Sequence, residues 1–458
     1  MTSYRPDPKI LILGPDFYDA VEPARSPKCI ARFVNERWAE RVGLELNDDS
    51  WARHFCRFEP LPDNLEQPLA LRYHGHQFRV YNPEIGDGRG FTFAQLRDDR
   101  CRLLDLGTKG SGQTPYSRHA DGRLTLKGGV REVLATEMLD ALGVNTSKSF
   151  ALFETGEALE RGDEPSPTRS SVLTRLSHGH IRIGTFQRLA FHGDSENMKK
   201  LVCYCLENLY GEQPASSDAE NALTLFDLIS QATAALAASY LAAGFVHGVL
   251  NSDNINITGE SFDYGPWRFT PYWEPAFTAA YFDHYGLYAF GRQPEAIHWD
   301  LAQLANCLSL IADGPALFEI LSGWSGRFED SLIGAMLRRL GIARGKDDHE
   351  LAAALIKALA TRAGTMDRIF FDWRGGRDPG IERYPADAFR KLAQLLRGRE
   401  NMSTHSYWSG QAPCSMHIEE VEAIWSAIAE LDDWQPFDNK VKAVRLMGKA
   451  VAQDAPAS

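Results

Sequence analysis

The chain has 458 residues, of which 44% are hydrophobic and 24% charged, as is ordinary for a globular protein with more than one packed region. Its formal net charge of −12 argues against broad nucleic-acid binding, which needs a basic surface. The sequence shows no apolar run long enough for a membrane span and no signal-peptide core, so we expect a cytoplasmic protein without membrane or nucleic-acid partners.

The first part of the chain predicts β-structure with one helix. That helix is expected at about 129–142, where apolar residues recur every three or four positions and Gly143 follows the last turn. The Pro-rich stretch at 161–167 indicates a loop and a lobe boundary. Short apolar segments bounded by turn residues predict strands at 91–96, 101–106 and 151–157.

Helical patterns dominate from about residue 195 onward. A β-rich half followed by a helical half predicts an α+β, two-lobed arrangement with a cleft, where ligands usually bind. The helices are expected at 196–209, 219–243, 299–322, 329–340, 349–363, 386–398 and 417–430.

The seven cysteines are spread widely and contain no Cys-x-x-Cys pair. Their odd number and wide spacing predict neither a disulfide framework nor a zinc site, and they favour a reduced, cytosolic setting. Zinc is also disfavoured at His178-Gly-His180, the only dense histidine pair, because no Cys or carboxylate is close in sequence.

The most informative motif is His247-Gly-Val-Leu-Asn-Ser-Asp-Asn254, which Asp263-Tyr-Gly-Pro266 follows at short distance. A carboxylate in a loop after a buried helix is where kinase-like proteins place their catalytic base, so Asp253 is the candidate proton acceptor. Asn254 and Asp263 offer the hard oxygen ligands that Mg²⁺ prefers. The alternative is a set of Asx turns, which the combination of both motifs disfavours.

A second group of residues indicates a phosphate site. Lys109 ends a predicted strand and Glu132 lies on the next helix; such a pair places an ammonium on nucleotide phosphates in kinase-type sites. The alternative is a surface lysine and a solvated glutamate. Arg175 and Arg182 suit anionic phosphates, because a guanidinium stays charged and binds in a bidentate manner.

Two glycine-rich segments carry weaker signals. In Gly86-Asp-Gly88-Arg89 the glycines allow the backbone to approach a ligand and the arginine can bind a phosphate, although the segment is also typical of a turn. Asp121 and Gly122 lie in a run dense in Gly, Asp and Arg, which indicates a ligand loop or again a turn.

Taken together and in this order, the motifs resemble those of the SelO (YdiU) protein adenylyltransferases, a pseudokinase family. The resembling segments are Tyr73-His-Gly-His-Gln-Phe78, Gly86-Asp-Gly-Arg89, Lys109-Gly-Ser-Gly-Gln-Thr-Pro-Tyr-Ser-Arg118, Asp121-Gly-Arg123, Arg131-Glu-Val-Leu-Ala-Thr-Glu-Met138, His180-Ile-Arg-Ile-Gly-Thr-Phe186, His247 to Asn254 and Asp263-Tyr-Gly-Pro266.

The resemblance implies a protein-kinase-like fold whose nucleotide is flipped relative to ordinary kinases, so that AMP rather than the γ-phosphate goes from ATP to a protein hydroxyl. By position, Asp253 matches the proton acceptor of the family, and Asn254 and Asp263 match its ligands for Mg²⁺, or Mn²⁺. The matching nucleotide contacts are Gly86, Gly88, Arg89, Lys109 with Glu132, Asp121, Gly122, Arg175, Arg182 and Asp263.

The resemblance also implies how the chain is divided. Residues 1–160 would form an N-terminal extension and a β-rich nucleotide-binding lobe, residues 161–320 a helical lobe with the catalytic and metal-binding loops, and residues 321–458 a divergent helical C-terminal extension. Two other functions stay open: adenylyl or phosphoryl transfer to a small molecule or peptide at the same site, and a non-catalytic ATP-binding scaffold.

The chain departs from the family pattern at several places. The family usually has Gly-Gly-His-Gln-Phe-Gly where this chain has His74-Gly-His-Gln-Phe-Arg79. The divergence is greatest beyond about residue 320, where the usual C-terminal motif and the terminal Cys or selenocysteine site are missing. We therefore expect no redox control through that end of the chain.

Overall fold

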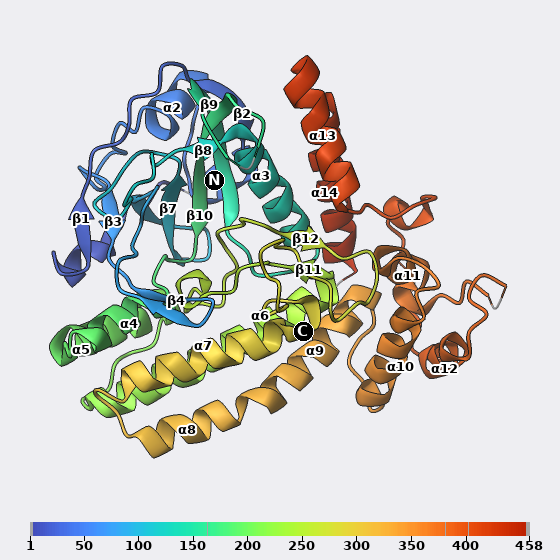
Figure 1. Cartoon of the computed structure of the whole chain (residues 1–458). Coiled ribbons are helices and arrows are strands. Elements are labelled where there is room, and N and C mark those ends of the chain that lie inside the picture. Colours follow the sequence, from blue (N-terminus) through green and yellow to red (C-terminus); the bar gives the residue numbers. More distant parts are fainter. Residues whose placement is uncertain (1–2, 163, 381, 402, 455–458) are drawn as a thin grey trace.

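Most strands lie before Ser177 and most helices after it, which confirms the α+β prediction of a β-rich first part and a helical second part (Figure 1). The computed structural model describes residues 3–162, 164–380, 382–401 and 403–454.

The N-terminal part is built on one eight-stranded sheet in which every pairing is antiparallel. Its order is β1 (Tyr18–Ala20), β3 (Leu69–Leu71), β6 (Thr92–Arg97), β7 (Leu103–Lys109), β10 (Thr168–Ser177), β9 (Lys148–Leu159) and β2 (Ile30–Val34), with β8 (Leu124–Thr125) beside β10. Two small two-stranded sheets lie apart from it, β4 (Gly75–Gln77) with β5 (Val80–Asn82) and β11 (Phe245–Val246) with β12 (Arg268–Phe269).

The predicted strands at 91–96, 101–106 and 151–157 are confirmed as β6, β7 and β9. The sequence analysis did not predict β10, although it lies between β7 and β9 at the centre of the sheet. The pairing of β10 with β7 sets Arg175 opposite Gly107, so the strand end that carries Lys109 and the strand that carries Arg175 lie side by side.

Helices cover both faces of the sheet. On one face α3 (Leu126–Ala141) packs against β9 and β10, and the close contact of Gly129 with Leu152 leaves no room for a larger residue. On the other face lie α1 (Glu36–Arg41) and α2 (Asp48–Phe55), and α2 contributes Trp51 and Phe55, whose rings lie 5.1 Å from that of Phe150. Burial of these aromatic side chains fixes the sheet between two apolar layers.

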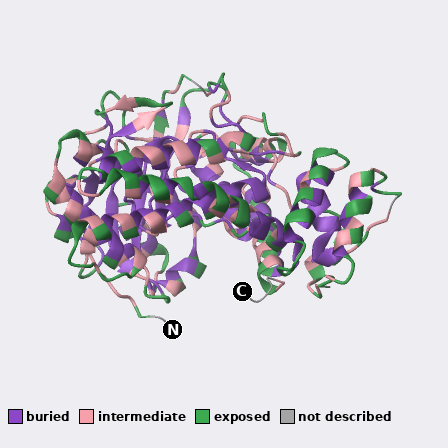
Figure 2. Cartoon of the chain, turned by 90° about the horizontal axis from the view of Figure 1, so that it is seen from below, coloured by how far each residue is buried: buried purple, intermediate pink, exposed green. Residues whose placement is uncertain are grey.

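The second part of the chain is a set of packed helices, and its buried residues lie within while the exposed ones form the outer surface (Figure 2). The longer helices are α4 (Ile183–Phe191), α5 (Ser195–Cys205), α6 (Asp218–Ala243), α7 (Gln293–Leu308), α8 (Gly314–Ser322), α9 (Trp324–Leu340), α10 (Asp348–Ala360), α11 (Met366–Asp372), α12 (Asp387–Leu396), α13 (Ile418–Leu431) and α14 (Gln435–Gln453). The short helices are η1 (Lys9–Leu13), the π-helical η2 (Leu206–Tyr210), η3 (Ser252–Asn254), η4 (Phe290–Arg292), η5 (Arg374–Gly376) and η6 (Ser406–Ser409).

Helix α6 packs against α7, α8 and α9 at the centre of this second part. Within the described part of the chain it is the one helix whose length and apolar composition would be sufficient to cross a membrane, and 61% of its most apolar stretch is buried inside the protein. That share of buried residues is typical of a core helix.

One predicted helix proves to be two. The segment at 299–322 was expected to be continuous, but α7 already begins at residue 293 and ends at Leu308, and α8 begins after Asp313. The Asp313 side chain accepts the Ala316 N–H at 3.2 Å and caps α8, and Pro315 follows at its first turn. Proline cannot continue a helix interior but fits a first turn, so the break follows from these two residues.

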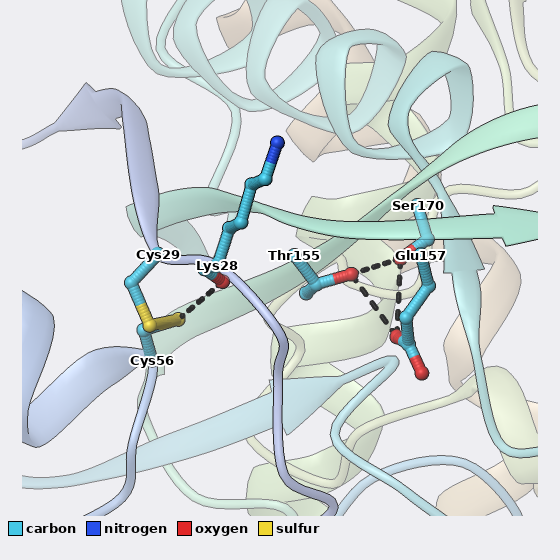
Figure 3. The surroundings of a disulfide bond; sticks show 6 residues. All are labelled: Lys28, Cys29, Cys56, Thr155, Glu157 and Ser170. Atoms are coloured by element: carbon cyan, nitrogen blue, oxygen red, sulfur yellow. Dashed lines mark hydrogen bonds between the residues drawn. A yellow bond between two sulfur atoms is a disulfide. The ribbon is translucent and has the colours of Figure 1, made fainter.

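The sequence analysis, which predicted no disulfide framework, missed one disulfide. Cys29 and Cys56 form a disulfide with a Cα–Cα distance of 6.0 Å, joining the segment before β2 to the end of α2 (Figure 3). Cysteine spacing could not show this, because the fold brings these two thiols together across 27 residues. The neighbouring Lys28 N–H donates to the Thr155 carbonyl at 2.8 Å, so the same segment is also tied to β9.

We expect reduction of this disulfide to lower the free energy of unfolding by about 3–4 kcal/mol, because closing a loop of this length restricts the unfolded chain by roughly that amount. Denaturant unfolding with and without a reductant measures the difference, and Cys29→Ser should reproduce it. Cys101→Ser, at an exposed free cysteine, is the matched control and should change neither curve. Identical midpoints in both conditions would contradict the prediction.

Candidate active site

A cavity of about 360 Å³ lies where the ends of β7 and β10 meet the loops that lead into the helical part. It is the place where most of the predicted site residues come together: Gly86, Gly88, Arg89, Lys109, Arg175, Arg182, Asp253 and Asp263 all line it. Residues far apart in the sequence thus share one polar cavity, as a binding site requires.

A buried ion network forms the floor of this cavity. Lys109 Nζ lies 2.6 Å from Glu132 Oε2 and 2.8 Å from Asp263 Oδ1. Arg175 Nη1 contacts the same two carboxylates, at 3.5 Å and 3.3 Å. Lys109 is 3% and Glu132 0% exposed, so the predicted pairing is confirmed and the alternative of a surface lysine with a solvated glutamate is excluded.

The network keeps Asp263 ionised. Burial raises the pKa of this carboxyl, but Lys109 and Arg175 outweigh that effect and hold the pKa well below its usual range. Its backbone also adopts the left-handed conformation, with a φ of 61°, which costs a non-glycine residue about 1–2 kcal/mol. The two cations compensate for this strain and fix the carboxylate toward the cavity.

Arg182 lies at the N-terminus of α4 and is 4% exposed. Its guanidinium lies 4.2 Å from the ring centre of Tyr73, and its Nη2 lies 3.3 Å from Asp87 Oδ1. Asp87 in turn accepts the Leu71 N–H at 3.0 Å through Oδ2. The guanidinium is therefore fixed from two sides and keeps its charge at the cavity.

Sequence reasoning missed Asp87 and Tyr116, although both lie inside the motifs that carried the resemblance. Asp87 lies in the segment that was assigned through Gly86, Gly88 and Arg89. Tyr116 packs against Gly86 so closely that a Cβ there would lie 2.5 Å from the tyrosine ring. The glycine is thus needed for loop packing, which the sequence pattern alone could not separate from ligand binding.

The loop of Asp253 is held by its two preceding residues. Asn251 Oδ1 accepts the Phe78 N–H at 2.9 Å and the Tyr288 hydroxyl at 2.6 Å. Ser252 Oγ accepts the His76 N–H at 2.7 Å and donates to Gln187 Oε1 at 2.6 Å. The Asn251 side chain thus accepts hydrogen bonds from distant segments instead of forming the Asx turn that was the alternative. These bonds from other parts of the chain hold η3 in place.

Asp253 combines burial with a free oxygen atom. It is 9% exposed, and its Oδ1 has no hydrogen-bond partner among the described residues. Burial raises the pKa of this carboxyl to about 6, although the positive charge of Arg182 acts in the opposite direction. A carboxylate of this kind suits the acceptance of a proton near neutral pH.

Asn254 and Asp263 carry side-chain oxygen atoms of the type that binds a magnesium ion. Asn254 donates its side-chain N–H to the Val249 carbonyl at 3.0 Å, which turns its own carbonyl oxygen to a different side as a potential ligand. Asp263 is ionised and lines the cavity. Among the described residues no group of three or more His, Cys, Asp or Glu side chains forms a protein-only metal cluster. Mg²⁺ takes one or two protein oxygens together with phosphates and water, so these donors suffice for it.

Four of the predicted residues lie outside the cavity lining. Glu132 lies beneath Lys109, and Asn254 follows Asp253. Asp121 forms an exposed pair with Arg161 at 2.8 Å, and Gly122 packs against Gly112 with a φ of 69°. Asp121 and Gly122 belong to the loop that gives Tyr116, Ser117 and Arg118 to the cavity wall. His180 lies 3.1 Å from Asp105, outside any zinc cluster among the described residues.

Buried cations thus converge on a polar cavity beside a free carboxylate, an arrangement typical of enzymes that transfer groups from polyanionic substrates. The family model of protein adenylyltransferase SelO matches residues 2–445, and the chain belongs to this family. The resemblance drawn from the motifs is therefore confirmed, and the protein is an enzyme of the nucleotidyltransferase class.

Curated relatives agree over nearly the whole chain. Proteins named "Protein nucleotidyltransferase YdiU" from Synechocystis sp., Gloeobacter violaceus and Synechococcus elongatus are 40%, 41% and 44% identical to it. The alignments cover 96%, 96% and 97% of this chain and 97%, 94% and 96% of the three relatives. The part of the chain beyond about residue 320, where the usual C-terminal motif is missing, is thus largely included in these alignments.

Proposed function

We propose that the protein transfers AMP from ATP to a Ser, Thr or Tyr hydroxyl of another protein and releases pyrophosphate. Family membership and the names of its relatives support this function. The observation that carries it is the position of the free Asp253 carboxylate in the same cavity as Lys109, Arg175 and Arg182. Four negative charges of ATP need such cations, and an acceptor hydroxyl needs such a base.

In this proposal each group has one role. Lys109, Arg89, Arg175 and Arg182 bind the phosphates and orient the α-phosphorus. The acceptor oxygen forms a bond to that phosphorus, the bond to the β-phosphate bridging oxygen breaks, and pyrophosphate leaves with the electron pair. The hydroxyl proton passes to Asp253. Mg²⁺, or Mn²⁺, held by Asn254 and Asp263, would neutralise phosphate charge when bound.

We also propose a protein-kinase-like division into lobes, with the sheet and α3 as the nucleotide-binding lobe, the helices from α4 onward as the second lobe and residues 321–458 as an extension. Because β10 pairs with both β7 and β9, the first lobe in this proposal extends to Ser177 instead of ending at residue 160. The Asp253 and Asp263 loops would then face the nucleotide from the second lobe.

Incubation with ATP labelled at the α-phosphate and, separately, at the γ-phosphate tests the reaction. Label on protein from the α-position only is the expected result. Label from the γ-position only would show phosphoryl transfer and overturn the proposal, and α-label only in a low-molecular-weight product would favour a small-molecule acceptor. Bound ATP without any transfer would favour a scaffold.

Replacing Asp263 by Ala tests the metal assignment. We expect Mg²⁺-dependent transfer to be lost, because the variant lacks the one carboxylate proposed to bind the ion. The transfer rate at increasing Mg²⁺ concentration is the measurement, and Asp387→Ala, at a side chain that is 90% exposed, is the matched control. Undiminished activity of Asp263→Ala would refute the assignment.

A further inference from the structure

Five large apolar side chains lie exposed on two segments that are far apart in the sequence. Tyr281 is 83%, Tyr285 93% and Val80 71% exposed, and Phe78 and Phe282 are partly exposed. The rings of Phe78 and Phe282 lie 5.9 Å apart, and those of Tyr281 and Phe282 5.1 Å apart, so the β4–β5 hairpin and the 281–285 segment meet. We call these five residues the aromatic rim.

The aromatic rim begins at the edge of the catalytic cavity. Gln77 lines that cavity, and Phe78 follows it directly. The Phe78 N–H donates to Asn251 Oδ1 at 2.9 Å, two residues before Asp253. The Tyr288 hydroxyl donates to the same oxygen atom, and its ring lies 5.1 Å from that of Phe78. The aromatic rim is therefore fixed to the loop that carries the proposed base.

The turn of the hairpin is built from residues that disfavour its conformation. Phe78 and Arg79 have φ values of 50° and 64°, and Gln77 pairs with Val80 across them. Two successive residues with positive φ make the hairpin turn that normally takes Asn-Gly. The family pattern described above has glycine at the position of Arg79. Large side chains at both positions therefore oppose the local backbone preference, and the contacts that hold Arg79 are the Trp299 ring, whose centre is 5.4 Å from its guanidinium carbon, and Glu295.

Arg79 adds charge to this surface. Its Nη2 lies 3.1 Å from Glu295 Oε1, and Arg292 contacts the same carboxylate, also at 3.1 Å. Two guanidinium groups thus share one exposed carboxylate, while Asp283 of the 281–285 segment is buried and accepts the Leu287 and Tyr288 N–H groups at 2.8 Å. Because the two guanidinium groups are solvent-accessible, their ion pairs contribute little to stability. An acidic group on a bound partner would complete the arrangement.

We propose that the aromatic rim and Arg79 dock the acceptor protein, through an extended segment that carries an apolar and an acidic residue near the modified hydroxyl. This inference rests on the proposed function. Exposed tyrosines give large contact areas at low entropic cost, and such residues commonly dominate protein recognition. A segment lying on the aromatic rim would reach the cavity at Gln77, where Asp253 accepts the hydroxyl proton.

Two synthetic peptides with a single serine test which kind of segment the aromatic rim binds. One has Phe and Asp beside the serine, and the other has Ala and Lys at the same positions. We expect wild-type enzyme to adenylylate the first with a kcat/KM at least about tenfold higher. The double variant Tyr281→Ala/Tyr285→Ala should raise KM for this peptide about tenfold, with kcat and ATP binding unchanged. Phe318→Ala on α8, at a side chain that is 69% exposed, is the control and should behave as wild type.

Arg79→Gly separates docking from a structural role. We expect a higher Tm, by roughly 1–3 °C, because glycine tolerates the positive φ, together with loss of the preference for the acidic peptide. A lower Tm with an unchanged preference would show that Arg79 is structural and overturn its part in docking. Equal use of both peptides by the wild type would contradict the proposed docking of an apolar and acidic segment. Absence of AMP transfer to any acceptor would instead contradict the proposed function itself.

Discussion

Asp253→Asn is expected to lose AMP transfer by about 10²–10⁴-fold while retaining ATP binding, because a general base contributes an acceleration of that size. Asparagine keeps the shape of the side chain but cannot take the acceptor proton. Transfer rates measured with α-labelled ATP give the loss, and nucleotide titration shows that the cavity still binds. A variant with wild-type rates would remove Asp253 from the proton transfer.

The same substitution is expected to stabilise the protein at neutral pH. The pKa of Asp253 is raised from its ordinary value of 3.8 to about 6 by burial, so the folded state holds this proton more tightly than the unfolded state. Stability therefore falls as the pH rises from about 4 to about 6. Above that range the ionised Asp253 lowers stability by a constant amount. Asparagine avoids a cost on the order of 2–3 kcal/mol.

Asp300→Asn is the matched control that separates the loss of transfer from the gain in stability. Asp300 on α7 is also buried, its Oδ2 has no hydrogen-bond partner among the described residues, and burial raises its pKa well above the usual range. It lies outside the cavity lining. We expect its replacement to leave the transfer rate unchanged and, by the same linkage, to raise stability at neutral pH as well. Unfolding curves between pH 4 and pH 8 and parallel rate measurements compare the two variants.

Much of the candidate site could be predicted from the sequence because its residue types have narrow chemical uses. The pairing of Lys109 with Glu132 follows from a strand and a helix that are adjacent in the chain, and local patterns placed both. Asp253 and Asp263 were assigned from their motifs. Arg175 and Arg182 were assigned from guanidinium chemistry and from the resemblance, but their convergence was not predictable, because Arg175 lies on β10 and Arg182 at the start of α4, two elements that the sequence analysis did not predict.

Several features of the fold and the site were not predicted, most of them because they depend on contacts between segments that are distant in the sequence. The Cys29–Cys56 disulfide and the anchoring of Asn251 by Phe78 join segments that are brought together only by the folded chain. The π-helix η2 and the division between α7 and α8 were missed because apolar spacing continues through both. Asp313 and Pro315 were the signals for the second break, as a cap and a first-turn proline.

Lys109→Met is expected to lower both activity and stability. The variant lacks a cation that faces the phosphates, which should slow transfer by ten- to a hundredfold or more, the effect of losing about 1.5–3 kcal/mol of charge-assisted binding. It also leaves Glu132, which is 0% exposed, with Arg175 at 3.5 Å as its remaining ion-pair partner among the described residues. Breaking a buried pair in this way costs about 3–5 kcal/mol.

Lys391→Met is the matched control for this loss of stability. Lys391 lies 2.6 Å from Glu350, the same separation as between Lys109 and Glu132, but both of its groups are about half exposed. Water screens such a pair, so we expect no measurable change in unfolding. Equal effects of the two substitutions on the free energy of unfolding would show that burial does not make the Lys109 pair more important for stability.

The double variant Lys109→Met/Glu132→Gln separates the two roles of the lysine. Removing the buried carboxylate charge together with the ammonium should recover most of the lost stability, because replacement of both partners leaves no unpaired ion. Activity should not recover, since the phosphates still lack the cation. A double variant that regains both would make Lys109 a purely structural residue, and one that regains neither would place the cost in packing instead of charge.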